Sequence, residues 1–166
     1  GNLGAPALGV EGAALASYLA TELDIRQIVT VQLDQNSTAS RVGFSIALGQ
    51  LPTRPQERTL LLDENTTIND LVSESIATET PVIVTYGPPE LAANFYAGLR
   101  NAGYVGVFAY NQALDPRFND NVSFEQLRGI LGTTTWAFSS TNPASNAFLN
   151  SFVRAFGTNN LPDCSN

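Results

Sequence analysis

Apolar and polar positions follow two periodicities along the chain, and each predicts a different kind of element. Short β-branched or apolar runs, typical of buried strands, occupy Gln27–Leu33, Thr59–Asp63, Pro81–Tyr86, Val105–Tyr110 and Gly132–Phe138. Stretches with apolar residues three or four apart, typical of helices, occupy Leu8–Leu23, Ala39–Leu51, Thr66–Thr78, Glu90–Asn101 and Asn142–Phe156, with a helical turn at Phe124–Leu127 and a polar loop at Asn111–Asn121.

The two kinds of element alternate, and this alternation predicts the fold class. We expect an α/β domain with an open, doubly wound, mainly parallel sheet and helices on both of its faces. No internal repeat or linker divides the sequence, so residues 1–166 read as one domain that ends in a polar tail over 158–166.

Short polar signals mark the helix ends within this pattern. Thr66 or Thr67, followed by Asp70, fits the start of a helix that is capped by a side chain. Gly103 stands where a helix would end in a left-handed residue. These signals fix two of the expected boundaries.

Composition and charge exclude several classes of protein. Of the 166 residues, 43% are hydrophobic, which is too many for a disordered chain, and no apolar run approaches the 18 or so residues of a membrane span. The formal net charge is −7, whereas proteins that bind nucleic acid present a basic face. We therefore expect no nucleic-acid partner.

The missing residue types argue against catalysis. The sequence has no His, all eight of its cations are Arg, and its one Cys, Cys164, lies near the end. The commonest general base, the Schiff-base lysine and thiolate metal sites are therefore absent, and we expect neither an enzyme nor a metal or other cofactor. A carboxylate pair formed by Asp34 and Asp63, which end neighbouring strands, is the enzymatic alternative. The absence of Met also indicates that this is a piece excised from a longer chain.

Two long stretches carry a resemblance to a known family. They read TPVIVTYGPPELAANFYAGLRNAGYVGVFAYN and ILGTTTWAFSSTNPASNAFLNSFVRAFGT. Their order of a Tyr-Gly strand end, an aromatic helix closed by Arg-x-x-Gly, a Trp strand, an Asn-Pro turn and a Phe-Gly helix resembles the second lobe of type 1 periplasmic solute-binding proteins. Within that family it is most similar to the branched-chain or hydrophobic amino acid receptors of ABC importers.

The resemblance implies a function without chemistry. Complete members have two lobes that close over a small solute, and this chain matches only the second lobe. The implied partners are an amino-acid-like solute, the first lobe of the same parent, and an ABC permease or a signalling module. The implied location is the periplasm or the extracellular face of a bacterial membrane.

Candidate ligand contacts lie where strands end, since doubly wound sheets bind ligands there. Tyr86 is the first candidate, because an aromatic ring with a polar tip suits a ligand side chain; the alternative is that it packs under the next helix. Gly87 would let the backbone approach a ligand closely, or would only form a tight turn.

The remaining candidates follow the family's placement. Thr38 stands where relatives have a ligand-contacting aromatic residue, and it is alternatively the N-cap of the next helix. Asn111 and Gln112 stand where amino acid receptors place an acid for the ligand ammonium. Because amides supply no charge-assisted bond, this departure weakens the case for an α-amino acid. It leaves open a ligand-sensing or degenerate interaction domain of a membrane signalling protein.

Overall fold

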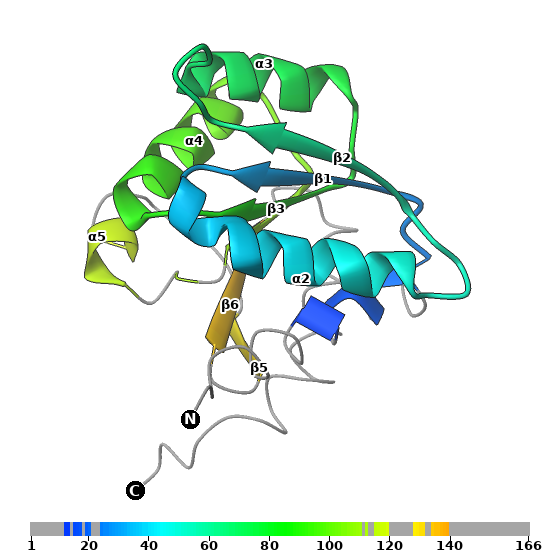
Figure 1. Cartoon of the computed structure of the whole chain (residues 1–166). Coiled ribbons are helices and arrows are strands. Elements are labelled where there is room, and N and C mark those ends of the chain that lie inside the picture. Colours follow the sequence, from blue (N-terminus) through cyan, green and yellow to red (C-terminus); the bar gives the residue numbers. More distant parts are fainter. Residues whose placement is uncertain are drawn as a thin grey trace, which may run out of the picture.

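The computed structural model describes residues 12–13, 15–17, 19–20, 24–110, 112, 115–119, 128–131 and 134–139. Its centre is a six-stranded sheet in the order β2-β1-β3-β4-β6-β5 (Figure 1). The strands are β1 (Gln27–Gln32), β2 (Gln56–Leu61), β3 (Val82–Tyr86), β4 (Val107–Tyr110), β5 (Arg128–Leu131) and β6 (Thr134–Ser139). The helices are the 3-10 helix η2 (Gln35–Ser37) and the α-helices α2 (Thr38–Gly49), α3 (Ile68–Ala77), α4 (Pro89–Asn101) and α5 (Pro116–Asn119).

The sheet confirms the expected fold class. Strands β2, β1, β3 and β4 are parallel, with Val29 level with Ile83 and Ile83 level with Phe108. Strand β6 runs antiparallel to β4, and β5 runs antiparallel to β6. Four parallel strands and an antiparallel pair make the sheet mainly parallel.

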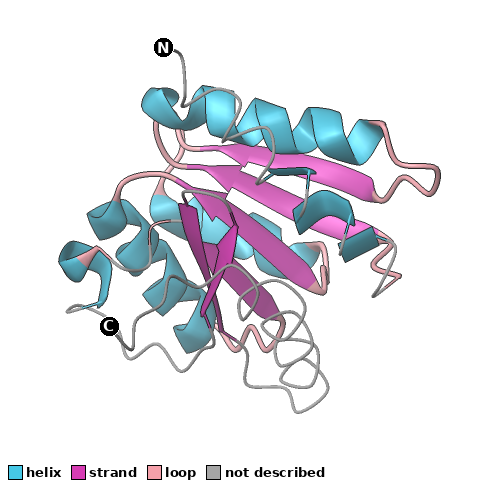
Figure 2. Ribbon diagram, turned by 90° about the horizontal axis from the view of Figure 1, so that it is seen from below, coloured by secondary structure: helices cyan, strands magenta, loops and turns pink. Residues whose placement is uncertain are grey.

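Helices cover both faces, because successive strand residues point to opposite sides (Figure 2). On one side Val84 packs with Phe44 and Leu48 of α2. On the other side Ile83 packs with residues of α3 and α4, among them Phe95. The two layers of side chains form two apolar cores, one on each face of the sheet. The packing on both faces fixes the positions of the central strands.

One strand boundary and two additional elements differ from the sequence-based expectation. Strand β2 begins at Gln56 and not at Thr59, because a strand at the sheet edge accommodates polar residues that face water. Helix α5 lies within the expected loop at Asn111–Asn121 and begins at Pro116, which suits a first helical turn. Strand β5 was not expected. Only two residues separate it from β6, and so short a link permits only an antiparallel hairpin.

The other described elements agree with the expectation within about two residues, the usual uncertainty of helix and strand ends. Both predicted helix signals are confirmed. Thr67 and Asp70 form a reciprocal capping box at the start of α3. Gly103 follows α4 with φ +89°, and the Tyr104 N–H donates to the Leu99 carbonyl at 2.9 Å.

Several predictions lie wholly or partly outside the described residues. Of the helix expected at Leu8–Leu23, residues 12–13, 15–17 and 19–20 are described and are helical. The helical turn at Phe124–Leu127, the helix at Asn142–Phe156, the tail over 158–166 and Cys164 are not described.

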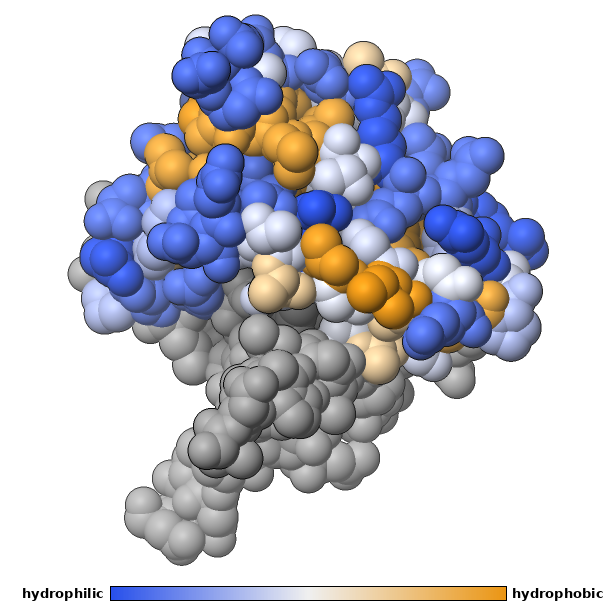
Figure 3. Space-filling view, viewed as in Figure 1, coloured by the Kyte–Doolittle hydropathy of each residue, from blue (hydrophilic) through white to orange (hydrophobic). Residues whose placement is uncertain are grey.

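The surface of the described part is mostly polar, with separate apolar areas between the polar side chains (Figure 3). Among the residues that the structure describes, the most exposed large apolar side chains are Ile46 at 56%, Val105 at 53% and Leu61 at 46%. No helix in the described segments has both the length and the apolar character that crossing a membrane requires.

Candidate functional site

A polar hollow lies at the carboxyl ends of β1, β3 and β4. In the sheet, β2 lies on one side of β1 and β3 lies on the other. The connections that leave β1 and β3 therefore run in opposite directions, and the hollow lies where they diverge. The cavity volume of the hollow is about 270 Å³. The hollow is lined by Asp34, Asn36, Ser37, Ser40, Tyr86, Gly87, Pro88, Pro89, Gln112 and Arg117.

One wall is the turn that leads from β1 into α2. The Asp34 carboxylate caps the short helix η2, and its Oδ1 accepts hydrogen bonds from the Ser37 N–H at 3.1 Å and from the Ser37 hydroxyl at 2.6 Å. Ser37 and Ser40 are three residues apart, so they share one face at the start of α2. The wall therefore presents small polar side chains on a locally capped backbone.

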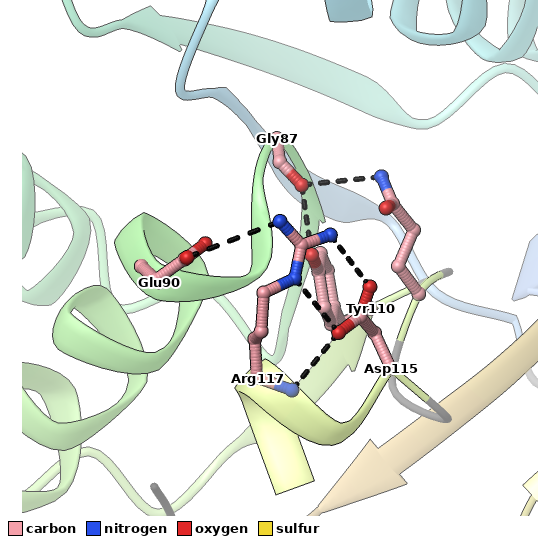
Figure 4. A network of polar contacts seen from close by, with 6 residues as sticks. Gly87, Glu90, Tyr110, Asp115 and Arg117 are labelled. Carbon is pink, nitrogen blue, oxygen red and sulfur yellow. Dashed lines mark hydrogen bonds and ion pairs between the residues drawn. The ribbon is translucent and has the colours of Figure 1, made fainter.

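The opposite wall is the backbone at Gly87, directly after β3. Its φ is +152°, and a Cβ there would stand 2.5 Å from the Cβ of Leu33, so the position requires glycine. The Gly87 carbonyl accepts hydrogen bonds from the Tyr110 hydroxyl at 2.8 Å and from the Gln112 Nε2 at 3.2 Å (Figure 4). Both lone pairs of this carbonyl are engaged, so it forms a fixed wall and not an acceptor for a ligand.

An ion-pair network borders the hollow beside Gly87. Arg117 donates from Nε to Asp115 Oδ1 at 3.0 Å and from Nη2 to Asp115 Oδ2 at 2.8 Å, and its Nη1 lies 3.9 Å from Glu90 (Figure 4). The hydrogen bonds from Arg117 lower the pKa of the Asp115 carboxyl. The same pairing raises the pKa of Arg117. The guanidinium is thus held at the rim, where solvent screens it.

Tyr110 links this network to the backbone wall. Burial raises the pKa of its hydroxyl, and the nearby negative charge of Asp115 raises it further. The hydroxyl therefore stays protonated at neutral pH and remains a donor to Gly87.

The structure brings together three of the five predicted contacts: Tyr86, Gly87 and Gln112 all line the hollow. The Tyr86 ring, however, lies in the core, with 2% of the residue exposed and its centroid 6.5 Å from that of Phe44. Tyr86 is thus buried, but it packs against α2 and not under the next helix, α4, as the packing alternative expected. Its role as a ligand contact stays a prediction.

The structure does not bring Thr38 into the hollow. Its hydroxyl donates to the Gln35 carbonyl at 2.8 Å and accepts from the Gln32 Nε2 at 3.0 Å. It is the first residue of α2, and Ser37 holds the N-cap position in its place. Asn111 lies outside the described residues.

Sequence reasoning missed Ser40 and Arg117. The signal for Ser40 is its spacing of three from Ser37 at a helix start, which places both on one face. The signal for Arg117 is the string Asp115-Pro116-Arg117, which predicts a capped helix with a cation in its first turn.

The described residues contain no cluster of three or more His, Cys, Asp or Glu that could hold a metal ion. The two carboxylates of the enzymatic alternative serve local turns. Asp34 binds Ser37, and Asp63 accepts from the Asn65 N–H at 2.8 Å and the Thr66 hydroxyl at 2.6 Å. These bonds lower the pKa of Asp63, whereas a general acid needs a raised one.

Neither the models of known protein families nor the characterised proteins match this sequence. Solved structures do match its fold. One is a putative branched-chain amino acid ABC transporter protein from Rhodospirillum rubrum, with a TM-score of 0.59 and 18% identity over 90% of this chain and 43% of that one. A leucine-binding protein from Thermotoga maritima gives a TM-score of 0.59 and 14% identity over 90% and 43% of the two chains.

An extracellular ligand-binding receptor from Verminephrobacter eiseniae gives a TM-score of 0.57 and 15% identity over 69% of this chain and 33% of that one. This chain therefore spans less than half the length of these three structures. Its fold is that of one lobe of a type 1 periplasmic binding protein.

Proposed function

We propose that this chain is one lobe of an extracytoplasmic solute receptor and that it acts by cleft closure without chemistry on its ligand. The observation that carries the proposal is the polar hollow at the point where the connections after β1 and β3 diverge. Open α/β sheets bind ligands at this place. The fold shared with three structures described as ligand receptors or transport proteins supports the same function.

The size of the hollow fits half of a binding site. Complete ligand pockets enclose roughly 300–1,000 Å³ and bury most of the ligand, whereas this hollow has about 270 Å³. A first lobe supplied by the same parent would close over it and complete the enclosure. The closed state would then be populated only when solute bridges the lobes, which is how such a receptor reports occupancy.

The lining favours a small polar solute. Among the described residues, the Ser40 hydroxyl and the Oδ2 atom of Asp34 make no hydrogen bond with the protein, so both are available to a ligand. The Gln112 amide donates to Gly87 and leaves its oxygen as an acceptor. A donor group on the ligand would meet these acceptors, and an amino acid or a related compound carries such groups.

The partners in this proposal follow from the fold. The solute and the first lobe are required by the half-site, and an ABC permease or a signalling module would receive the signal of closure. Such a receptor would work in the periplasm or at the extracellular face of a bacterial membrane.

The test is a titration of this chain that is followed by its backbone amide NMR signals. A panel of neutral amino acids, small amides and carboxylic acids would be added to tens of millimolar, because half of the contacts of a micromolar site leave roughly millimolar affinity. We expect saturable shifts at Ser40, Gly87 and Gln112. Ser40→Trp should fill the hollow and abolish them, while Ser73→Trp on the exposed face of α3 should leave them unchanged.

Two results would contradict the proposal. Shifts that saturate equally in Ser40→Trp would place the ligand elsewhere. The absence of saturable shifts, both in this chain and in the full parent protein, would favour the degenerate interaction domain.

A further inference from the structure

Strand β2 forms the open edge of the parallel part of the sheet. It pairs with β1 on one side, and no described strand pairs with it on the other. Four of its six residues are exposed, and Leu61 retains 46% of its accessible surface. Exposed edges of this kind are ready to pair with another strand.

The backbone of β2 divides its hydrogen-bonding groups between two sides. The Gln56 N–H donates to the Arg26 carbonyl and the Leu62 N–H to the Gln32 carbonyl, both at 2.9 Å, so even-numbered residues face β1. In a parallel ladder the intervening residues point their N–H and C=O the other way. Glu57, Thr59 and Leu61 therefore turn their N–H and C=O groups outward, and among these groups the Leu61 carbonyl already accepts a hydrogen bond from the Thr66 hydroxyl at 3.3 Å.

The start of β2 is not covered by another described element. A hollow of about 540 Å³ lies at the amino ends of β1 and β2, beside the end of α3, and is lined by Gln27, Arg54, Pro55, Gln56, Glu57, Arg58 and Thr78. The Glu57 side chain is turned away to the Thr30 and Ser45 hydroxyls, at 2.8 and 2.6 Å. Its carboxylate is thereby held against β1 and α2, where it does not obstruct an incoming strand.

We propose that the occupant of this edge is a second copy of the chain, paired antiparallel through β2 about a two-fold axis at Thr59. The result is one continuous sheet across the two copies. A two-fold contact must be self-complementary, because the same residues supply both sides. The β2 sequence meets this condition in one register.

In the register centred on Thr59, Thr59 lies opposite its own copy and Glu57 opposite Leu61. Thr59 then exchanges two backbone hydrogen bonds with its own copy, and the Leu61 N–H donates to the opposite Glu57 carbonyl at each end, about four bonds in total. The Glu57 N–H would share the opposite Leu61 carbonyl with the Thr66 hydroxyl. The neighbouring registers are worse, because opposed like charges destabilise strand pairs. Centring on Arg58 or on Glu57 opposes two identical charges, and centring on Leu60 sets Glu57 against Asp63.

Charged residues that flank β2 are also complementary between the two copies. The register centred on Thr59 sets Arg54 of each copy against the acidic turn Asp63–Glu64 of the other, once at each end of the ladder. Arg54 and Glu64 are exposed and have no ion-pair partner among the described residues. Each is therefore free to meet its counterpart.

Sedimentation velocity on this chain, from about 10 µM to about 1 mM, tests the proposal across the affinities expected of so small a contact. We expect a concentration-dependent dimer. Thr59→Pro removes an outward N–H without touching the β1 ladder, a change that edge strands tolerate, and it should leave only monomer. Thr59→Val keeps the N–H and is the matched control that should still dimerise.

A charge exchange gives a second test that does not depend on a proline. Arg54→Glu alone and Glu64→Arg alone should each weaken the dimer about tenfold, since each change affects both ends. The double variant should recover most of the loss. A wild-type chain that stays monomeric to about 1 mM, or a double variant no better than the single ones, would overturn the proposal.

Discussion

Gly87 offers the sharpest test of how the site is built, because the structure makes two separate demands on it. Its φ of +152° lies in a region that L-residues avoid, and an added Cβ would lie 2.5 Å from the Cβ of Leu33. The first demand costs about 1–2 kcal/mol for a residue with a side chain. The second costs about 1–3 kcal/mol, because the surrounding core has to shift.

Alanine at position 87 would also reduce the entropy of the unfolded chain, which offsets about 0.4–1 kcal/mol. We therefore expect Gly87→Ala to lower the free energy of unfolding by about 2–4 kcal/mol. Gly103 has φ +89° with nothing within 4 Å of an added Cβ, so Gly103→Ala isolates the backbone demand at about 1 kcal/mol. Gly43, inside α2, also has open space, and Gly43→Ala should stabilise by about 1 kcal/mol.

Urea unfolding of the three variants, followed by circular dichroism, gives the three free energies on one scale. The close approach of Gly87 to Leu33 predicts the order Gly87→Ala, then Gly103→Ala, then Gly43→Ala, from the most to the least destabilised. Equal losses for Gly87→Ala and Gly103→Ala would refute the contribution of Leu33. If Gly43→Ala destabilised the chain, alanine would be unfavourable even inside a helix with open space, and the three free energies could no longer be compared in this way.

Two further predictions concern single polar contacts. Thr67→Ala removes the capping box of α3 and should lower the free energy of unfolding by about 1 kcal/mol, while Thr53→Ala, in an exposed connection, should have almost no effect in the same urea titration. Arg117→Gln should return the pKa of Asp115 toward its ordinary value, as followed by carboxyl-carbon NMR. Because that pKa is lowered in the folded chain, the stabilisation by the pair is present above the ordinary Asp pKa and is lost as the pH falls through the lowered one. A pKa of Asp115 that is unchanged by Arg117→Gln would contradict this assignment.

The apolar pattern predicted β1, β3 and β4 well because almost all of their residues are buried, on both faces of the sheet. A run such as Pro81–Tyr86 has few alternatives to a central strand. Strand β5 was missed because its four residues become a strand only by pairing with β6, a contact that no local pattern announces. The polar start of β2 was missed for the same reason, since an edge position tolerates residues that a central strand would exclude.

At the site, the sequence could place loops at strand ends but could not tell which side chains face the hollow. Successive residues of an α-helix point about 100° apart. That rotation directs Ser37 and Ser40 into the hollow, whereas Thr38 bonds Gln32 instead. Arg117 was missed because α5 reaches the hollow only through the tertiary fold.

The two walls of the hollow differ in what evolution can change. The wall at Gly87 is made of backbone, fixed by glycine geometry and by two hydrogen bonds to one carbonyl. The wall at Asn36 and Ser40 is made of side chains on a turn that Asp34 already caps. Substitutions at Asn36 and Ser40 can therefore reshape the cavity while the sheet and its packing stay intact, so that, under the proposed function, one scaffold could be adapted to many solutes.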